Sequence, residues 1–299
     1  MATKELSSTT IVTDNRENTE DKAPETDNNP KQFQIPNMLE RYELKYTIPF
    51  SMIEPMEQFI KPYCSYDNYS TLSTKTDNFY KVNSLYFDTP EFLFLRKRMM
   101  KEENRFNMRI RSYGDEPVAP YFLEIKQRRS DTVRKFRAKC DDIFLKELGN
   151  IQLKPSHFST SEKEYKNQEL FYNTLQTYHA NPVVLVQYMR KAFISDVDDY
   201  ARVTFDRSLR YMPQNAFNVH PYETNMIPCD NETNFDAGCS IILELKCFTS
   251  YVPMWMIDLI RVFQLNRRGF SKYSNCIRPV FDRYSCGDIF SRNPNRHFN

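Results

Sequence analysis

Glycine is scarce in this sequence, with five residues in 299. Neither GxGxxG nor GxxxxGK[ST] occurs anywhere in the chain. These motifs build the glycine-rich turns through which dinucleotide-binding folds and P-loop proteins cradle phosphate groups. The composition therefore argues against both classes.

Long apolar runs are also absent. No stretch approaches the roughly 20 apolar residues that a helix needs to cross a bilayer. The polar N-terminus lacks the apolar core of a signal peptide. The seven cysteines contain no CxxC pair, which disfavours a zinc site and a disulfide framework. We therefore expect free thiols, no membrane segment and a cytoplasmic protein.

Neither sign of charge is in large excess over the whole chain. The formal net charge is +2, so any strongly basic surface has to be local. Residues 1–37 are polar and poor in large apolar side chains, which predicts a disordered N-terminal tail. We expect one domain over residues 38–284 and a polar C-terminal tail over residues 285–299.

What the chain does contain is a repeated triplet of Glu, an apolar residue and Lys. It occurs as Glu43-Leu44-Lys45, Glu124-Ile125-Lys126 and Glu244-Leu245-Lys246. Because side chains alternate across a strand, each triplet places its two charges on one face and its apolar residue on the other. Three distant strands with one charged pattern indicate a shared surface, such as the lining of a barrel.

About eight segments show this alternation, with helical patterns between and after them. Strands are expected at residues 40–48, 82–87, 105–111, 121–126, 132–138, 182–194, 200–209 and 241–246. Helices are expected at residues 51–63, 91–99, 141–149, 162–179 and from Pro253 to near Gly269. The pattern predicts an α+β protein with an eight-stranded antiparallel β-barrel flanked by helices.

The alternation alone leaves open which way the charged faces point. Outward faces would form a solvated surface around an ordinary apolar core. Inward faces would gather a surplus of cations against four carboxylates, because the interior would hold Lys45, Arg109, Arg111, Lys126, Lys135, Arg137, Arg190, Arg202 and Lys246 against Glu43, Glu124, Asp206 and Glu244. Unpaired buried charges are costly, so such a surplus is tolerable only in a wet tunnel whose occupant is a polyanion.

An ordered series of motifs carries a family resemblance. RYELKYTIP, SLYFDTP, NMRIRSYG, FLEIK, VRKFRA, YMRKAF, ARVTFD, ILELK and FSKY, between about Leu39 and Pro279, resemble the VTC domain. This is the polyphosphate polymerase branch of the triphosphate tunnel metalloenzyme, or CYTH-like, superfamily. The resemblance implies an eight-stranded tunnel with inward charged faces. It also implies an ATP-polyphosphate phosphotransferase that releases ADP and uses Mn²⁺ or Mg²⁺.

The resemblance assigns site residues motif by motif. The catalytic set is expected to be Lys272, Arg109, Arg111 and Lys126. The phosphate-binding set is expected to be Lys45, Arg109, Arg111, Lys126, Lys135, Arg137, Arg190, Arg202, Lys246, Ser271 and Lys272. The expected metal ligand is Glu244, with Glu43 and Glu124 as further candidates.

These residue types suit phosphoryl transfer, which depends on positioning and charge stabilisation more than on a protein nucleophile. Arg grips two phosphate oxygens at once, whereas Lys acts as a mobile point charge. A carboxylate-held cation bridges phosphate oxygens and screens the developing charge. All four histidines lie outside the motifs, so no catalytic histidine is expected.

Two other interpretations stay open. Tunnel triphosphatases usually begin with Glu-x-Glu-x-Lys, whereas Arg41 precedes Glu43 and Lys45 here, which favours a polymerase over a tri- or polyphosphate phosphohydrolase. A non-catalytic polyphosphate-binding module would not need Glu244. No RNP-like aromatic motif occurs, so nucleic acid is not an expected partner; ATP, pyrophosphate and polyphosphate are. The sequence does not define an oligomeric state.

Overall fold

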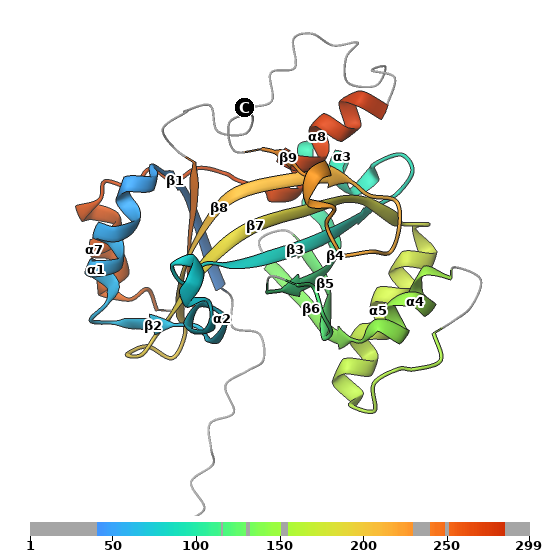
Figure 1. Cartoon of the computed structure of the whole chain (residues 1–299), viewed down its shortest axis with the longest axis horizontal. Helices are drawn as coiled ribbons and strands as arrows, with labels where there is room; N and C mark the ends of the chain where they lie inside the picture. The colour runs from blue at the N-terminus through green and yellow to red at the C-terminus, as the bar shows by residue number, and fades with distance from the viewer. Residues whose placement is uncertain are drawn as a thin grey trace, which may run out of the picture. The chain divides into compact units, whose positions relative to one another are not determined.

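The computed structural model describes residues 41–114, 116–129, 132–150, 155–229, 240–248 and 251–284 (Figure 1). The polar tails expected at residues 1–37 and 285–299 lie outside these ranges.

The strands of the described residues form one antiparallel sheet. Its main path runs β1 (Arg41–Ile48), β10 (Ile241–Phe248), β8 (Ala201–Pro213), β7 (Asn181–Ser195), β3 (Tyr80–Asp88), β4 (Asn104–Tyr113), β5 (Tyr121–Arg129) and β6 (Thr132–Cys140). Two short strands lie off this path, since β2 (Cys64–Tyr66) pairs with β7 and β9 (Ile227–Pro228) pairs with β8. The eight expected strands and their antiparallel arrangement are confirmed.

The sheet curls until its two ends face each other. Lys126 on β5 forms an ion pair with Glu43 on β1, although five strands separate β1 from β5 in the sheet. Among the described strands no backbone ladder joins β1 to β6. Side chains reaching across the concave face therefore close the curl where backbone hydrogen bonds do not.

The helices divide between the two faces of this sheet. On the outer face, α1 (Ile53–Ile60) and α7 (Met254–Val262) pack over β1, β8 and β10. Also outside, α4 (Asp142–Gly149) and α5 (Glu162–Thr177) cover β4 and β5. In Figure 1 the α1–α7 pair and the α4–α5 pair lie at opposite ends of the curled sheet. These helices bury the apolar outer faces of β1, β4, β5, β8 and β10, which leaves the charged faces of these strands turned inward.

Two further helices pack near the inner face. These are α3 (Leu93–Met99) and α8 (Lys272–Tyr284), which share an apolar cluster with inward residues of β3 and β7. A short helix, α2 (Asn68–Leu72), follows β2 and pairs its N-cap Asp67 with the Ser70 amide. In the described residues no helix combines the length and apolarity that membrane crossing requires.

The helix α8 was not expected, since no element was assigned between Gly269 and the C-terminal tail. Pro279 inside the helix and the polar run before it conceal the signal. The signal is nevertheless present, because Tyr273, Cys276, Ile277 and Val280 follow helical spacing and are all buried. The five expected helices are present with narrower bounds, and α2 was not expected.

Candidate functional site

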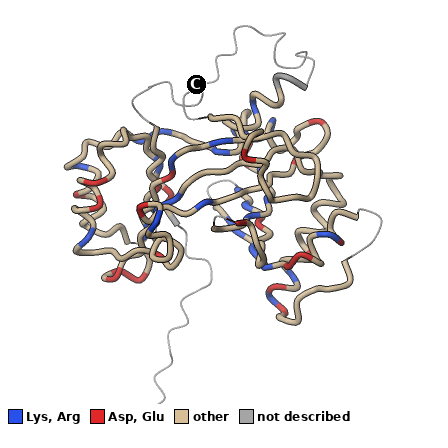
Figure 2. The backbone as a smooth tube through the Cα atoms, viewed as in Figure 1, with Lys and Arg blue, Asp and Glu red and all other residues tan. Residues whose placement is uncertain are grey.

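The charged faces of the strands point inward, as the tunnel interpretation requires. Figure 2 shows Lys and Arg positions recurring along the strands of the sheet. The side chains of Glu124 and Asp206 are each 1% exposed and that of Glu244 is 5% exposed, although all three are carboxylates. Such burial is tolerable only because cations surround each carboxylate.

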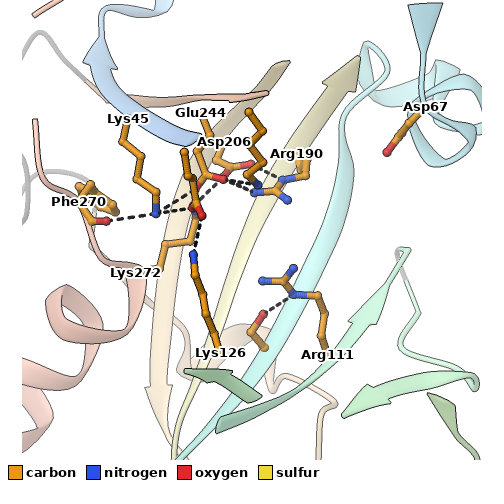
Figure 3. A network of polar contacts seen from close by, with 12 residues as sticks. Lys45, Asp67, Arg111, Lys126, Arg190, Asp206, Glu244, Phe270 and Lys272 are labelled. Atoms are coloured by element: carbon orange, nitrogen blue, oxygen red, sulfur yellow. Dashed lines mark hydrogen bonds and ion pairs between the residues drawn. The ribbon is translucent and has the colours of Figure 1, made fainter. Parts of the chain in front are cut away.

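Glu244 on β10 is contacted by four cations (Figure 3). Its Oε1 lies 3.0 Å from the Nζ of Lys272 and 3.4 Å from that of Lys45. Its Oε2 lies 2.9 Å from the Nζ of Lys246 and 3.6 Å from Nη2 of Arg190. Burial alone would raise the pKa of Glu244, but these four cations hold it well below its ordinary value. Glu244 is therefore ionised at neutral pH.

Asp206 on β8 joins the same group, and the sequence analysis gave it no role. Arg190 donates Nε and Nη2 to its two oxygens, both at 2.7 Å, and Lys272 Nζ lies 2.6 Å from Oδ2. Burial works to lower the pKa of Lys272, but Asp206 and Glu244 raise it above its ordinary value. Lys272 therefore stays an ammonium. The ARVTFD motif held the signal, because it places Asp206 on the same strand face as Arg202.

The first turn of α8 presents Lys272 to these carboxylates. Ser271 accepts a hydrogen bond from the Ser274 amide at 3.2 Å and so acts as the cap of the helix. Lys45 on β1 donates to the carbonyl oxygen of Phe270 at 3.3 Å, which ties the preceding segment to the sheet. The positive end of the helix dipole adds to the electropositive field at this point.

Glu43 on β1 links the two ends of the curl. Its carboxylate pairs with Lys126 across the concave face and with Lys45 at 3.1 Å. Burial works to raise the pKa of Glu43, but Lys45, Lys126 and Lys246 bring it below its ordinary value. Burial also lowers the pKa of Lys126, in spite of its contact with Glu43.

Glu124 on β5 gathers a second set of cations from neighbouring strands. Arg109 Nε and Nη2 both lie 2.7 Å from Oε2, and Lys135 Nζ lies 2.6 Å from Oε1. Arg137 and Arg111 approach to 3.4 and 3.9 Å. Burial would raise the pKa of Glu124, yet Arg109, Arg111 and Lys135 hold it well below its ordinary value. The pKa of Lys135 falls to about 8, because burial and the repulsion of Arg109 and Arg111 outweigh the attraction of Glu124.

Two of the predicted phosphate-binding residues stand apart from these groups. Arg202 Nη2 lies 3.4 Å from Asp67 Oδ2, and its side chain is 38% exposed. Ser271 contacts Ser274 of its own helix. The structure brings the other predicted cations into contact with Glu43, Glu124, Asp206 or Glu244, on one continuous inner face.

Inward tyrosines are a further component that the sequence analysis did not assign. Arg109 Nη1 donates to the Tyr86 hydroxyl at 3.0 Å, and the Tyr188 ring lies 4.8 Å from the Lys272 ammonium. Arg111 lies 5.8 Å from the ring centroid of Tyr113. Tyr188 and Tyr113 each sit two positions from an inward Arg on the same strand, which is the signal that could have found them.

The carboxylates determine how the site could hold a divalent metal. Among the described residues no group of three or more His, Cys, Asp or Glu side chains could hold a metal ion. Magnesium is usually held by one or two carboxylates together with substrate phosphates and water. Glu244 and Glu43 fit that role, since both are ionised and lie on adjacent paired strands. The donor set fits a metal that arrives with phosphate, and it does not form a preformed all-protein metal site.

Comparison with known proteins gives a family match and distant relatives. The family model described as the VTC domain matches residues 40–281. The chain is 23% identical over 226 residues to vacuolar transporter chaperone complex subunit 4 of Trypanosoma cruzi, and 24% identical over 227 residues to that of Trypanosoma brucei brucei. Each match covers 67% of this chain but only 28% of the relative, so the chain spans well under half the length of these proteins.

A solved structure, the PH1819 protein of Pyrococcus horikoshii, is similar with a TM-score of 0.40 and 10% identity, over 80% of this chain and 99% of that one. A similarity of that size carries no argument about function.

Proposed function

Because the chain belongs to the VTC domain family, we propose that it is a polyphosphate polymerase that transfers the γ-phosphate of ATP to an inorganic polyphosphate chain and releases ADP. The observation that carries the proposal is the charge surplus of the described inner face. Nine cations on this face contact the four carboxylates Glu43, Glu124, Asp206 and Glu244. Such a surplus is stable when a polyanion occupies the space.

The reaction joins the acceptor to the γ-phosphorus and frees ADP. A terminal oxygen of orthophosphate, pyrophosphate or the growing chain forms a bond to the γ-phosphorus. The bond from that phosphorus to the β–γ bridging oxygen breaks, and the bridging oxygen keeps the electron pair on ADP. Arg109, Arg111, Lys126 and Lys272 hold the phosphates in line and neutralise charge on their oxygens.

Lys272 is the central cation of this proposal. Its raised pKa keeps it charged, and its Nζ already bridges Asp206 and Glu244, so a phosphate oxygen that enters there meets a fixed positive charge. A bound Mg²⁺ or Mn²⁺ would supply positive charge that offsets the negative charge of the phosphates. Glu244 and Glu43 are the residues that would hold it.

We also propose that the protein is located in a reducing compartment, the cytoplasm. Cys64, Cys140 and Cys247 are free thiols, and all three are buried. Free thiols are the form that the glutathione and thioredoxin systems of the cytosol maintain.

A phosphohydrolase is the second candidate. The ionised carboxylates Glu43 and Glu244 would serve equally well to hold a metal that assists hydrolysis of a tri- or polyphosphate. Arg41 in place of the first carboxylate of the triphosphatase pattern favours the polymerase. The products of the reaction decide between the two.

The test is incubation of the full chain with ATP, Mn²⁺ or Mg²⁺ and a trace of pyrophosphate, followed by gel separation of the products. Lys272→Ala and Glu244→Ala are compared with Lys166→Ala and Glu162→Ala, which change exposed side chains of the same types on α5. A ladder of phosphate chains with ADP, lost only in the first two variants, is the expected result.

Orthophosphate without chains would establish the phosphohydrolase instead. Tight polyphosphate binding without turnover would leave a non-catalytic binding module. Absence of both binding and turnover in the unaltered protein would overturn the proposal.

A further inference from the structure

The inner face differs in character at its two ends. Along β4 the inward residues run in the order Arg105, Asn107, Arg109, Arg111 and Tyr113. At about 3.4 Å per residue, the first and last of these lie roughly 27 Å apart. One end of the row is therefore cationic and the other aromatic, with the phosphate-binding arginines between them.

The neighbouring strand extends the same gradient. On β5, Arg128 pairs with Arg105 at the cationic end, and Phe122 pairs with Arg111 toward the aromatic end. Arg98 at the C-terminal part of α3 joins the cationic end, where burial and the nearby Arg105 and Arg128 lower its pKa. Like charges gathered at one end form a favourable path for phosphates that carry no nucleoside.

Four rings make up the aromatic end, namely Tyr69, Tyr80, Tyr113 and Phe122. Tyr69 of α2 lies 4.8 Å from Tyr113 and 5.2 Å from Tyr80, between ring centroids. Tyr113 lies 5.4 Å from Phe122. Asp67 holds α2 in this position by accepting hydrogen bonds from the Ser70 amide and the Tyr80 hydroxyl.

The aromatic end is open to solvent and adjoins the phosphate-binding cations. Tyr69 is 38% exposed, and the Arg137 side chain, whose guanidinium lies 3.9 Å over the Phe122 ring, is 40% exposed. The Tyr113 hydroxyl accepts hydrogen bonds from Arg111 at 3.5 Å and from Arg137 at 3.3 Å. A phosphate held by Arg111 and Arg137 would therefore lie next to exposed aromatic and guanidinium planes.

We propose that the aromatic end binds the nucleoside of the nucleoside triphosphate, with its base stacked on Tyr69 and Arg137, and that polyphosphate leaves past Arg98, Arg105 and Arg128. This inference rests on the proposed function. Aromatic rings and arginine planes are the groups that stack with nucleobases, and such stacking tolerates any base because every base has a π face. The orientation gives the donor and the growing chain opposite ends of one tunnel.

The test compares two ligands that differ by the nucleoside. Binding of ATP and of inorganic tripolyphosphate to the full chain is measured by calorimetry with Mg²⁺ present. Tyr69→Ala is expected to weaken ATP binding about tenfold, the loss typical of one base stack. Its affinity for tripolyphosphate is expected to stay unchanged. In turnover, the KM for ATP rises while kcat holds.

Matched variants separate stacking from packing. Tyr69→Phe keeps the ring and is expected to bind ATP normally, whereas Tyr69→Leu fills the space without a planar face and is expected to lose affinity as the Ala variant does. Tyr222→Ala removes a tyrosine that is 60% exposed on the loop before β9 and should change nothing. If the Ala variant fails to fold, the Leu variant decides.

The outcomes keep this inference distinct from the proposed function. Unchanged ATP binding in Tyr69→Leu, with polymer still made by the unaltered protein, would overturn the nucleoside site alone. Equal weakening of ATP and tripolyphosphate would show that Tyr69 merely shapes the tunnel, which also overturns it. Failure of the unaltered protein to bind either ligand would overturn the proposed function.

Discussion

Two groups of charges on the inner face differ in composition and in origin. The Glu124 group sets one carboxylate against Arg109, Arg111, Lys135 and Arg137, all from the adjacent strands β4, β5 and β6. The Glu244 group sets Glu43, Asp206 and Glu244 against Lys45, Lys126, Arg190, Lys246 and Lys272, which come from β1, β5, β7, β10 and α8. The first group is rich in cations, and the second mixes both signs.

The difference in composition between the two groups suits them to two different tasks, anion binding and phosphoryl transfer. A cluster of cations with only one carboxylate binds phosphate oxygens but offers few ligands for a metal. A cluster with three ionised carboxylates can hold a metal as well as phosphate. We therefore assign anion holding chiefly to the Glu124 group and phosphoryl transfer chiefly to the Glu244 group, and each of the following changes tests that division.

The largest expected effect is on turnover. Glu244→Gln keeps the side-chain volume but removes the charge that orders Lys272 and Lys45, so kcat should fall about 100- to 1000-fold, as when a preorganised electrostatic contact is lost. Steady-state kinetics should show a smaller loss for Glu124→Gln, with Glu162→Gln on exposed α5 as the control. An equal or greater loss in Glu124→Gln would refute the division of tasks.

The next effect is on the stability of the ligand-free protein. Glu124 is 1% exposed, so Glu124→Gln leaves Arg109 and Lys135 facing each other without a counter-charge. The free energy of unfolding should fall by about 3 kcal/mol, measured in urea. Tripolyphosphate supplies negative charge and should stabilise this variant more than the unaltered protein. Equal stabilisation of the two would count against the group as an anion holder.

The third effect is a pH dependence that arises at Lys135 and Tyr113, beside Glu124. Burial, together with the repulsion of Arg109 and Arg111, lowers the pKa of Lys135 to about 8. The side chain is therefore positively charged below that pH and neutral above it. Burial opposes ionisation of Tyr113, but Arg111 and Arg137 lower its pKa to about 8, so it gains negative charge over the same range.

Both titrations weaken polyanion binding as pH rises. Affinity for tripolyphosphate should drop about tenfold between pH 7 and 9, the value of one charged hydrogen bond. Combining Lys135→Arg with Tyr113→Phe should flatten the curve, because an arginine stays charged throughout. Lys272→Arg should leave the slope unchanged, since the pKa of Lys272 is already raised. A slope that survives the double substitution would assign the titration elsewhere.

The smallest effect is expected at Arg202, which belongs to neither group. Its side chain is 38% exposed and pairs with Asp67, so Arg202→Gln should weaken tripolyphosphate binding by less than about fivefold. Arg190→Gln removes a buried bidentate contact with Asp206 and should weaken tripolyphosphate binding clearly more than Arg202→Gln does. Calorimetry on both variants checks the order, and a reversed order would extend the Glu244 group to Arg202.

The sequence predicted the strands better than it predicted the helices. Strand alternation is visible in segments as short as the Glu-apolar-Lys triplet, and every triplet lies on a strand of the structure. The helix α8 was missed because Pro279 and a polar first turn obscure a buried stripe that only its packing against β3 and β7 explains. The short helix α2 was missed as well, although it carries Tyr69 to the aromatic end.

In the candidate site too, the prediction succeeded where a residue's position depends on strand alternation and failed where it depends on tertiary contacts. The predicted cations that belong to strands do lie on one face, because period-two alternation is a local property of the backbone. Asp206 escaped assignment because its role depends on Lys272, which reaches it from another element. The aromatic end depends on α2 lying against β3 and β4, which no local pattern indicates.

By itself the sequence determined which residues share a strand face, since side-chain alternation needs no distant partner. Only the tertiary structure decided that this face turns inward, that Lys126 meets Glu43 across the concave face, and that α8 delivers Lys272 to two buried carboxylates. Those outcomes depend on helices covering the outer face and on the curl of the sheet, because both arise from burial and pairing between segments far apart in the chain.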